Sequence, residues 1–517
     1  MRLAIITLLL LAAAAAGCND DGGSQTGTDV PDAGDDASGL ADASDDDDDD
    51  DDDEPECESG KERCPGGEHW VCFGGEWVED PCPEPTTCDD YHPLCACPGD
   101  AGTAITGTVH APNGLDPVSR AFVFLPSDPT NIPVEEAGAH CIKCLEPGLV
   151  KKSTTTDAEG AFRLTDFPEG QEQTVVVRKG PFQRTYSFTP EQCSDNQIPD
   201  DLIRLPADPT EAGENGRFPS IAVSTGMFDR MEEVIAKAGI QADYIDIFNG
   251  GGDPAVANKG NAGEELFAGF DEDTGEDNIM KYDIVFINCG QSGGSWDTIA
   301  QTRRELLHRY VSNGGRLYVT DMAYDFIEQP FPDKIAFLAD QGAVSGAIDA
   351  AEHGKESALQ KGTVMDDNLE EWLSTNFPGE INNNAEVNIV GWLQNWVVVD
   401  EFDPSPSNAD PEVYRDKDLW VQGEVTYNDN VTETKPLTIS FNIDPPGTAD
   451  LKAADRLSCG RVLFSSYHTF KEGDPGTVTD AGVPDGGTGS EISVQERILE
   501  YLVLEIGVTI CENIVID

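Results

Sequence analysis

The sequence predicts a multi-domain exported protein that joins a β-sandwich to an α/β doubly wound parallel sheet. Two patterns indicate these folds: short alternating strands over residues 103–205, and strand–helix alternation from residue 218 to the end. A signal-like N-terminus predicts export. The chain has 517 residues, enough for about three or four domains. A disordered tether over residues 18–56 and a small disulfide-rich module over residues 57–100 are expected to precede the two larger folds.

The first 17 residues have the pattern of a secretory signal peptide. Arg2 precedes a short apolar run, and small residues lead up to Cys18. The run is too short to span a bilayer. A cysteine directly after the small residues resembles a bacterial lipoprotein signal, although Ala15 stands where that family usually carries Leu. The resemblance implies lipidation of Cys18 and anchoring in the cell envelope, at the outer membrane; the alternative is an ordinary secreted protein with an incidental cysteine.

The segment after Cys18 is strongly acidic. Residues 19–56 hold no Lys or Arg and include nine consecutive aspartates, Asp45 to Asp53. Such a segment cannot bury enough apolar surface to fold, and its like charges extend it, so we expect a spacer. A calcium loop would need spaced ligands around a defined turn, which this run lacks. The whole chain carries a net charge of −66, which excludes nucleic acid as a partner.

Cysteines predict a disulfide framework. Seven of them fall within residues 57–100, a stretch too short for a core of its own, where disulfides are favoured over zinc. Further along, Cys141 and Cys144 form a CxxC pair beside His140; a loop disulfide or a bridge to Cys193 is favoured there, with a metal or redox pair as alternatives. The disulfide candidates are Cys57, Cys64, Cys72, Cys82, Cys88, Cys95, Cys97, Cys141, Cys144, Cys193, Cys459 and Cys511.

The β-rich region over residues 103–205 carries a specific motif. Thr156, Asp157, Gly160 and Phe162 fit a T-D-x-x-G-x-F pattern between two predicted strands, in which Asp157 and Gly160 shape a turn and Phe162 enters the core. With "ITGTV" and "AFVFLP" upstream, the region resembles the carboxypeptidase regulatory-like domain. That resemblance implies a transthyretin-like sandwich without peptidase residues, serving as a spacer or as a binding module for protein or carbohydrate.

Residues 218–517 alternate apolar strands with helices. Near-continuous apolar strands between helices predict a parallel sheet covered on both faces. A long insertion, about 340–455, interrupts the pattern. We expect strands over 221–225, 244–248, 283–288, 316–321 and 461–465, and helices over 228–238, 297–312 and 495–506.

The segments "YDIVFINCG", "YVSNGGRLYVTD" and "GRVLFSSYH" resemble class I glutamine amidotransferase-like domains, including the ThuA-like branch. In that family a nucleophilic cysteine sits on a sharp turn after a strand. The corresponding strand here ends at Asp321, so the resemblance argues against glutaminase activity. His468 falls where the family's catalytic histidine lies, but Phe470 replaces the usual carboxylate. The mature chain also resembles a group of Gram-negative lipoproteins that join these two folds, which implies no known activity.

Several polar residues follow strands of the predicted sheet. Cys289 is the fallback nucleophile, because it follows an apolar strand at the carboxyl edge, where such sheets place their sites. Asn288, Asp321, Asp325 and His468 are expected at the same edge. The alternative is a structural Cys289 and a hydrogen-bonded structural His468. Cys289 is also the candidate for the cysteine left unpaired. No HxxxH or HxH spacing occurs, so the sequence predicts neither a metal nor a cofactor.

Together these features predict a lipid-anchored cell-envelope protein with a non-catalytic binding or structural role. Its expected partners are the membrane, through the lipid on Cys18, and a protein or carbohydrate ligand. The alternative is an envelope hydrolase of glycan or amide bonds, which would use His468 with Cys289, Asp321 or Asp325 at the carboxyl edge of the sheet.

Overall fold

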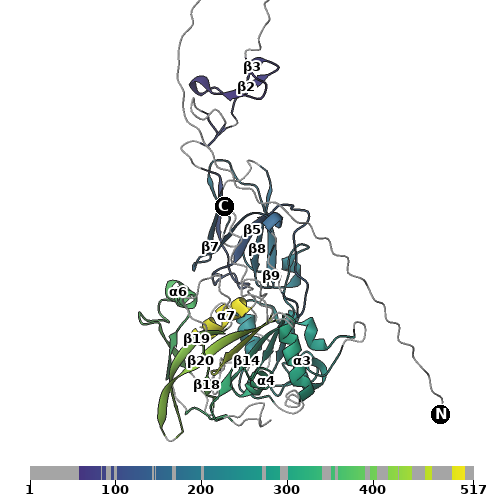
Figure 1. Ribbon diagram of the computed structural model, residues 1–517, viewed down its shortest axis with the longest axis vertical. Helices are drawn as coiled ribbons and strands as arrows, with labels where there is room; N and C mark the ends of the chain where they lie inside the picture. Colours follow the sequence, from purple (N-terminus) through teal and green to yellow (C-terminus); the bar gives the residue numbers. More distant parts are fainter. Residues whose placement is uncertain are drawn as a thin grey trace, which may run out of the picture.

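The computed structural model describes residues 57–506 apart from a set of internal segments. Cys18, the acidic tether, Cys144, Cys459 and Cys511 therefore lie outside the described residues. Figure 1 shows the Cys-rich module, the β region and the large sheet following one another along the long axis. In the described part, no helix is both long and apolar enough to cross a membrane. The segments left out are 83, 89–94, 98–101, 142–144, 146, 166–170, 200–202, 271–274, 292–300, 340–350, 356–358, 391–395, 405–416, 429, 445–459 and 469–491.

Disulfides hold the Cys-rich module together, as predicted. Its antiparallel sheet consists of β1 (Glu62–Arg63), β2 (Trp70–Phe73) and β3 (Glu76–Glu79), strands too short to enclose a core. A fourth bridge ties the module to the β region, where it joins Cys97 to Cys193. The expected alternative of a Cys193 bridge to Cys141 or Cys144 is therefore wrong, although Cys141 is itself disulfide-bonded. The bridges inside the module are Cys57–Cys72, Cys64–Cys88 and Cys82–Cys95.

The β region, residues 102–205, contains two sheets. Valines of the larger sheet and Phe162 of the smaller one belong to the same apolar cluster. The predicted turn forms: Asp157 Oδ1 accepts a hydrogen bond from the Ala161 amide at 2.8 Å, and Gly160 has φ +75°. One sheet has the order β10-β4-β7 and the other β6-β5-β8-β9, from β4 (Ala104–Thr108), β5 (Phe122–Pro126), β6 (Val150–Thr155), β7 (Ala161–Thr165), β8 (Gln173–Lys179), β9 (Phe182–Phe188) and β10 (Asp195–Gln197).

The α/β region, residues 218–506, is built on a mixed nine-stranded sheet of order β12-β11-β13-β14-β21-β20-β19-β16-β17. The first five strands are parallel and match the predicted ones. The others are antiparallel and come from the insertion, for which the sequence predicts no fold, so the sheet is mixed and the predicted parallel sheet forms only part of it. The strands are β11 (Ile221–Ser224), β12 (Ile245–Phe248), β13 (Ile284–Ile287), β14 (Arg316–Thr320), β16 (Leu359–Val364), β17 (Glu386–Val390), β19 (Lys417–Tyr427), β20 (Val431–Ile443) and β21 (Gly460–Ser465).

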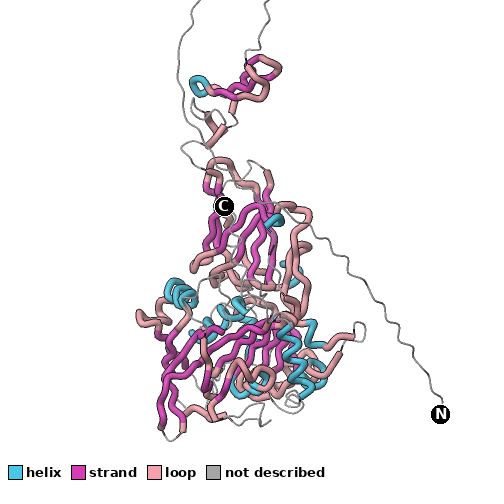
Figure 2. The backbone as a smooth tube through the Cα atoms, in the orientation of Figure 1, coloured by secondary structure: helices cyan, strands magenta, loops and turns pink. Residues whose placement is uncertain are grey.

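Both faces of the parallel strands are buried. Side chains alternate across a strand, so Phe286 packs in one apolar cluster with α2 and α7, whereas Val285 and Ile287 pack in a second cluster with α3 and α4. Figure 2 shows these helices beside the magenta strands of the large sheet. A separate small sheet pairs β15 (Ala336–Phe337) with β18 (Val399–Glu401). The helices are α1 (Pro209–Ala212), α2 (Met231–Lys237), α3 (Gln301–Ser312), α4 (Asp325–Glu328), α6 (Asp367–Asn376) and α7 (Val494–Ile506).

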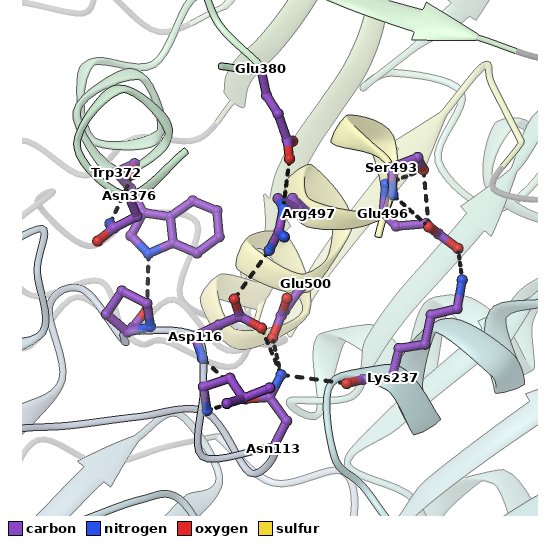
Figure 3. A network of polar contacts seen from close by, with 12 residues as sticks. Asn113, Asp116, Lys237, Trp372, Asn376, Glu380, Ser493, Glu496, Arg497 and Glu500 are labelled. Atoms are coloured by element: carbon purple, nitrogen blue, oxygen red, sulfur yellow. Dashed lines mark hydrogen bonds and ion pairs between the residues drawn. The ribbon is translucent and has the colours of Figure 1, made fainter. Parts of the chain in front are cut away.

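The β region and the α/β region meet along a polar seam. Loop 113–117 of the β region faces helices α2, α6 and α7 (Figure 3). In loop 156–160, the Ala158 carbonyl accepts a hydrogen bond from Asn376 of α6. The Trp372 indole Nε1 donates a hydrogen bond to the Pro117 carbonyl at 2.9 Å. Arg497 on α7 pairs with Asp116 at 3.1 Å. One apolar cluster also extends through both regions, so they form a single packed body.

Candidate functional site

The candidate site lies at the carboxyl edge of three neighbouring parallel strands. Cys289 follows β13, Asp321 follows β14 and His468 follows β21. The strands are in parallel register, with Ile287 opposite Val319, and Thr320 opposite Ser465. Because parallel strands end at one edge, the three side chains reach the same place, as the sequence predicts.

The three reactive groups meet at one carboxylate oxygen. The Cys289 thiol donates to Asp321 Oδ2 at 3.5 Å, and His468 Nε2 lies 2.9 Å from the same oxygen. One ring nitrogen, the sulfur and one carboxylate oxygen all lie within 4.8 Å of one another. Cys289 is also a free cysteine, as predicted. The expected Cys289–His468 proximity is thus confirmed.

Asp321 occupies a sharp turn between β14 and the short 3-10 helix Asp321–Ala323. Its φ is +41°, in the left-handed region that few non-glycine residues adopt, although Asp is among the better tolerated there. Such a turn after a strand is where the amidotransferase resemblance places its nucleophile. In this chain the residue at the turn is an aspartate, so a carboxylate occupies the position after β14.

The second oxygen of Asp321 is held by the insertion. Oδ1 accepts a hydrogen bond from the Val397 backbone amide at 2.7 Å, just before β18. The sequence did not predict this contact, because a backbone amide leaves no signal in residue type. With both oxygens engaged, the carboxylate is fixed in orientation, and β18 and the end of β14 are coupled through it.

Burial dominates the electrostatics of the cluster. Cys289, Asp321 and His468 are 1%, 1% and 4% exposed. Burial, reinforced by the charge of Asp321, raises the pKa of Cys289, so the sulfur stays a thiol. Burial acts to lower the pKa of His468, but the adjacent Asp321 carboxylate outweighs it and the pKa is raised. The Asp321 charge therefore opposes ionisation of the Cys289 thiol and favours the protonated form of the His468 imidazole.

The other predicted residues lie near this cluster but have different partners. The Asn288 amide donates to Glu232 Oε2 at 2.9 Å and to the Asp229 carbonyl at 3.2 Å, both at the start of α2. Asp325, on α4, accepts from Gln329 one helical turn away at 3.2 Å. Burial raises the pKa of Glu232 to about 7.

Sequence reasoning missed Asp229 and Glu232, although both are buried. A signal was available, because these acids follow β11, and β11 ends at the same carboxyl edge as β13 and β14. Asp229 lies between β11 and α2, and Glu232 lies in the first turn of α2. The prediction used the same kind of position, after a parallel strand, for Cys289 and Asp321. The polar residues that follow each parallel strand, taken together, therefore predict which side chains share the carboxyl edge of the sheet.

No protein-family model matches the chain, and no curated protein matches it. The site must therefore be interpreted from its own chemistry. Nucleophilic catalysis needs an ionisable, accessible nucleophile. Here the thiol is buried with a raised pKa, and the carboxylate at the turn has both oxygens engaged. The arrangement suits a fixed internal contact better than turnover.

Proposed function

We propose that this chain is a lipid-anchored cell-envelope protein with a non-catalytic binding or structural role toward protein or carbohydrate. One observation carries the proposal. The turn after β14, where related folds carry a nucleophile, holds Asp321, which is 1% exposed and bound by Val397 and His468. A group so enclosed is poorly placed to reach a large glycan or peptide substrate.

The packing of the molecule supports a binding or scaffolding role. The β region, with its resemblance to carboxypeptidase regulatory-like domains, is held to the α/β region by the polar seam (Figure 3). Two regions fixed in this way present one continuous rigid surface. An acidic spacer behind a lipidated Cys18 would place that surface away from the membrane.

The test uses the full chain expressed with its signal in a Gram-negative host. We expect a diacylglyceryl group on the mature N-terminal cysteine by mass spectrometry, and release from the membrane fraction in Cys18→Ser. On glycan arrays and in pull-downs, ligand capture should be unchanged in Cys289→Ala. Robust turnover of glycan or amide substrates by the purified protein, without ligand capture, would overturn the proposal.

A second candidate function is an envelope hydrolase acting on glycan or amide bonds. The observation that favours it is the convergence of Cys289, Asp321 and His468 within 4.8 Å, at the edge where such sheets bind substrates. The double variant Cys289→Ala, His468→Ala decides this point. A hydrolase of this type would lose its activity in the variant, and activity that persists there would exclude these residues as its catalytic group.

A further inference from the structure

We propose that Cys289, Asp321 and His468 bind one divalent transition-metal ion, of which Zn²⁺ fits best. The inference is independent of the proposed function, because a buried ion can serve as a structural link between strands. It assigns a ligand to the one cluster in the described residues that brings together a free thiol, a carboxylate and an imidazole.

The distances fit a shared ion. Zinc takes cysteine sulfur at about 2.3 Å and histidine nitrogen or carboxylate oxygen at about 2.0–2.2 Å, usually with tetrahedral angles. Those bonds place neighbouring ligand atoms about 3.3–3.6 Å apart. Here the sulfur lies 3.5 Å from Asp321 Oδ2 and the imidazole nitrogen 2.9 Å from it. The sulfur and a ring nitrogen of His468 lie within 4.8 Å of each other. Shifts of about 1 Å or less would therefore complete three corners of a tetrahedron.

The orientation of His468 is a second, independent observation. Nε2 is buried and forms no hydrogen bond of acceptable geometry among the described residues, although Asp321 Oδ2 is only 2.9 Å away. A nitrogen that lies close to a carboxylate oxygen but is not aligned with it for an N–H bond is typical of two ligands that share an ion. A buried imidazole left in this state is otherwise costly.

Charge balance favours a dication. A thiolate and a carboxylate neutralise an ion of charge +2, so the loaded site would be neutral in a low-dielectric interior. Metal binding deprotonates the cysteine outright. The charge of Asp229 also acts on both Cys289 and His468. The fourth position is left to water.

A second group of potential ligands serves as an internal control. His69, Cys82 and Cys95 also place their ligand atoms within 4.8 Å of one another. Cys82 and Cys95 are bonded to each other, however, so neither can supply a thiolate. His69 is instead held by Glu62 at 2.9 Å. The proposal therefore predicts that removing His69 leaves metal binding unchanged.

The experiment titrates the full, disulfide-intact chain with Co²⁺ after dialysis against a chelator. We expect one tightly bound Co²⁺ per chain, with a near-ultraviolet thiolate-to-cobalt band and the visible bands of a tetrahedral site, both bleached by Zn²⁺. The thiolate band should be lost in Cys289→Ser and retained in His69→Gln. Absence of the band in the wild-type chain, or its persistence in Cys289→Ser, would overturn the proposal.

X-ray absorption on the zinc-loaded wild-type protein gives a test that needs no variant to fold. The proposal requires one sulfur at about 2.3 Å and the remaining ligands at about 2.0–2.2 Å. A shell of oxygen atoms alone would mean that zinc binds elsewhere, for example on the aspartates of residues 45–53, and would refute the assignment to Cys289.

Discussion

The seam and the site cluster are both buried and polar, but they arrange charge in different ways. At the seam, opposite charges meet: Lys179 of β8 pairs with Glu505 of α7, and Arg497 pairs with both Asp116 and Glu380. At the cluster, a thiol and the Asp321 carboxylate lie beside the imidazole of His468, and the charge of Asp229 also acts on that imidazole. The first arrangement fixes two regions to each other, whereas the second brings a free thiol, a carboxylate and an imidazole together at the carboxyl edge of a sheet, which is typical of sites.

The largest effect is expected at the seam, from Lys179→Met. Lys179 is 2% exposed, and its ammonium pairs with Glu505 and donates to the Ser119 carbonyl at 2.9 Å. Removing it leaves the buried Glu505 carboxylate without its charge partner. We expect the free energy of unfolding to fall by about 3–5 kcal/mol, measured by urea denaturation.

The double variant Lys179→Met, Glu505→Leu provides the control for this effect. Replacing both members of a buried ion pair with apolar groups is often nearly neutral. The double variant should therefore recover to within about 2 kcal/mol of the wild type. Equal destabilisation in the single and double variants would show that packing, not charge pairing, holds the seam.

Near the cluster, removing the buried charge of Glu232 should stabilise the protein. Burial raises the pKa of Glu232 from 4.5 to about 7. The folded state then binds the proton more tightly than the unfolded state, so stability is greatest at low pH and falls as pH rises from 4.5 through 7. Glu232→Gln keeps the acceptor for Asn288 without the charge. At pH 8 we expect it to be more stable than the wild type by roughly 3 kcal/mol.

The pH dependence separates this effect from a general gain in stability. Urea denaturation of the wild type and Glu232→Gln should give similar midpoints near pH 4 and diverge by pH 8. Glu233→Gln, at the next position on α2, removes a carboxylate that pairs with Arg230 at 2.9 Å and should show no such gain. A constant difference across the pH range would contradict the assignment of the raised pKa to Glu232.

The parallel half of the large sheet was predictable because its strands are buried on both faces. Ile284 to Ile287 are all fully buried, and such a run leaves an unbroken apolar signal. The antiparallel half gave a weaker signal. At the exposed end of β20, residues 431–434 are polar or exposed, and Pro436 interrupts the pattern. The pairing of β16 with β19 joins distant segments, with Val364 opposite Val421, and residue periodicity does not report such pairings.

The residues of the candidate site could be predicted from the positions at which the parallel strands end. Cys289, Asp321 and His468 each follow a parallel strand, and the rule for carboxyl edges brings them together. Three features could not be predicted from the sequence. They are the hydrogen bond from the Val397 amide to Asp321, the orientation of His468 and the Cys97–Cys193 bridge. Each depends on contacts between distant segments, set by packing rather than by residue type or spacing.

The smallest effect tests whether the predicted turn of the β region also joins the seam. Asn376, the last residue of α6, donates to the Ala158 carbonyl at 2.8 Å, and Ala158 lies in the turn that Asp157 and Gly160 shape. Asn376→Ala removes that hydrogen bond and should lower the free energy of unfolding by about 1 kcal/mol. Thr375→Ala, at the exposed neighbouring position, is the control. Equal loss in both variants would assign the effect to α6 itself; loss in Asn376→Ala alone would show that the turn contributes to docking.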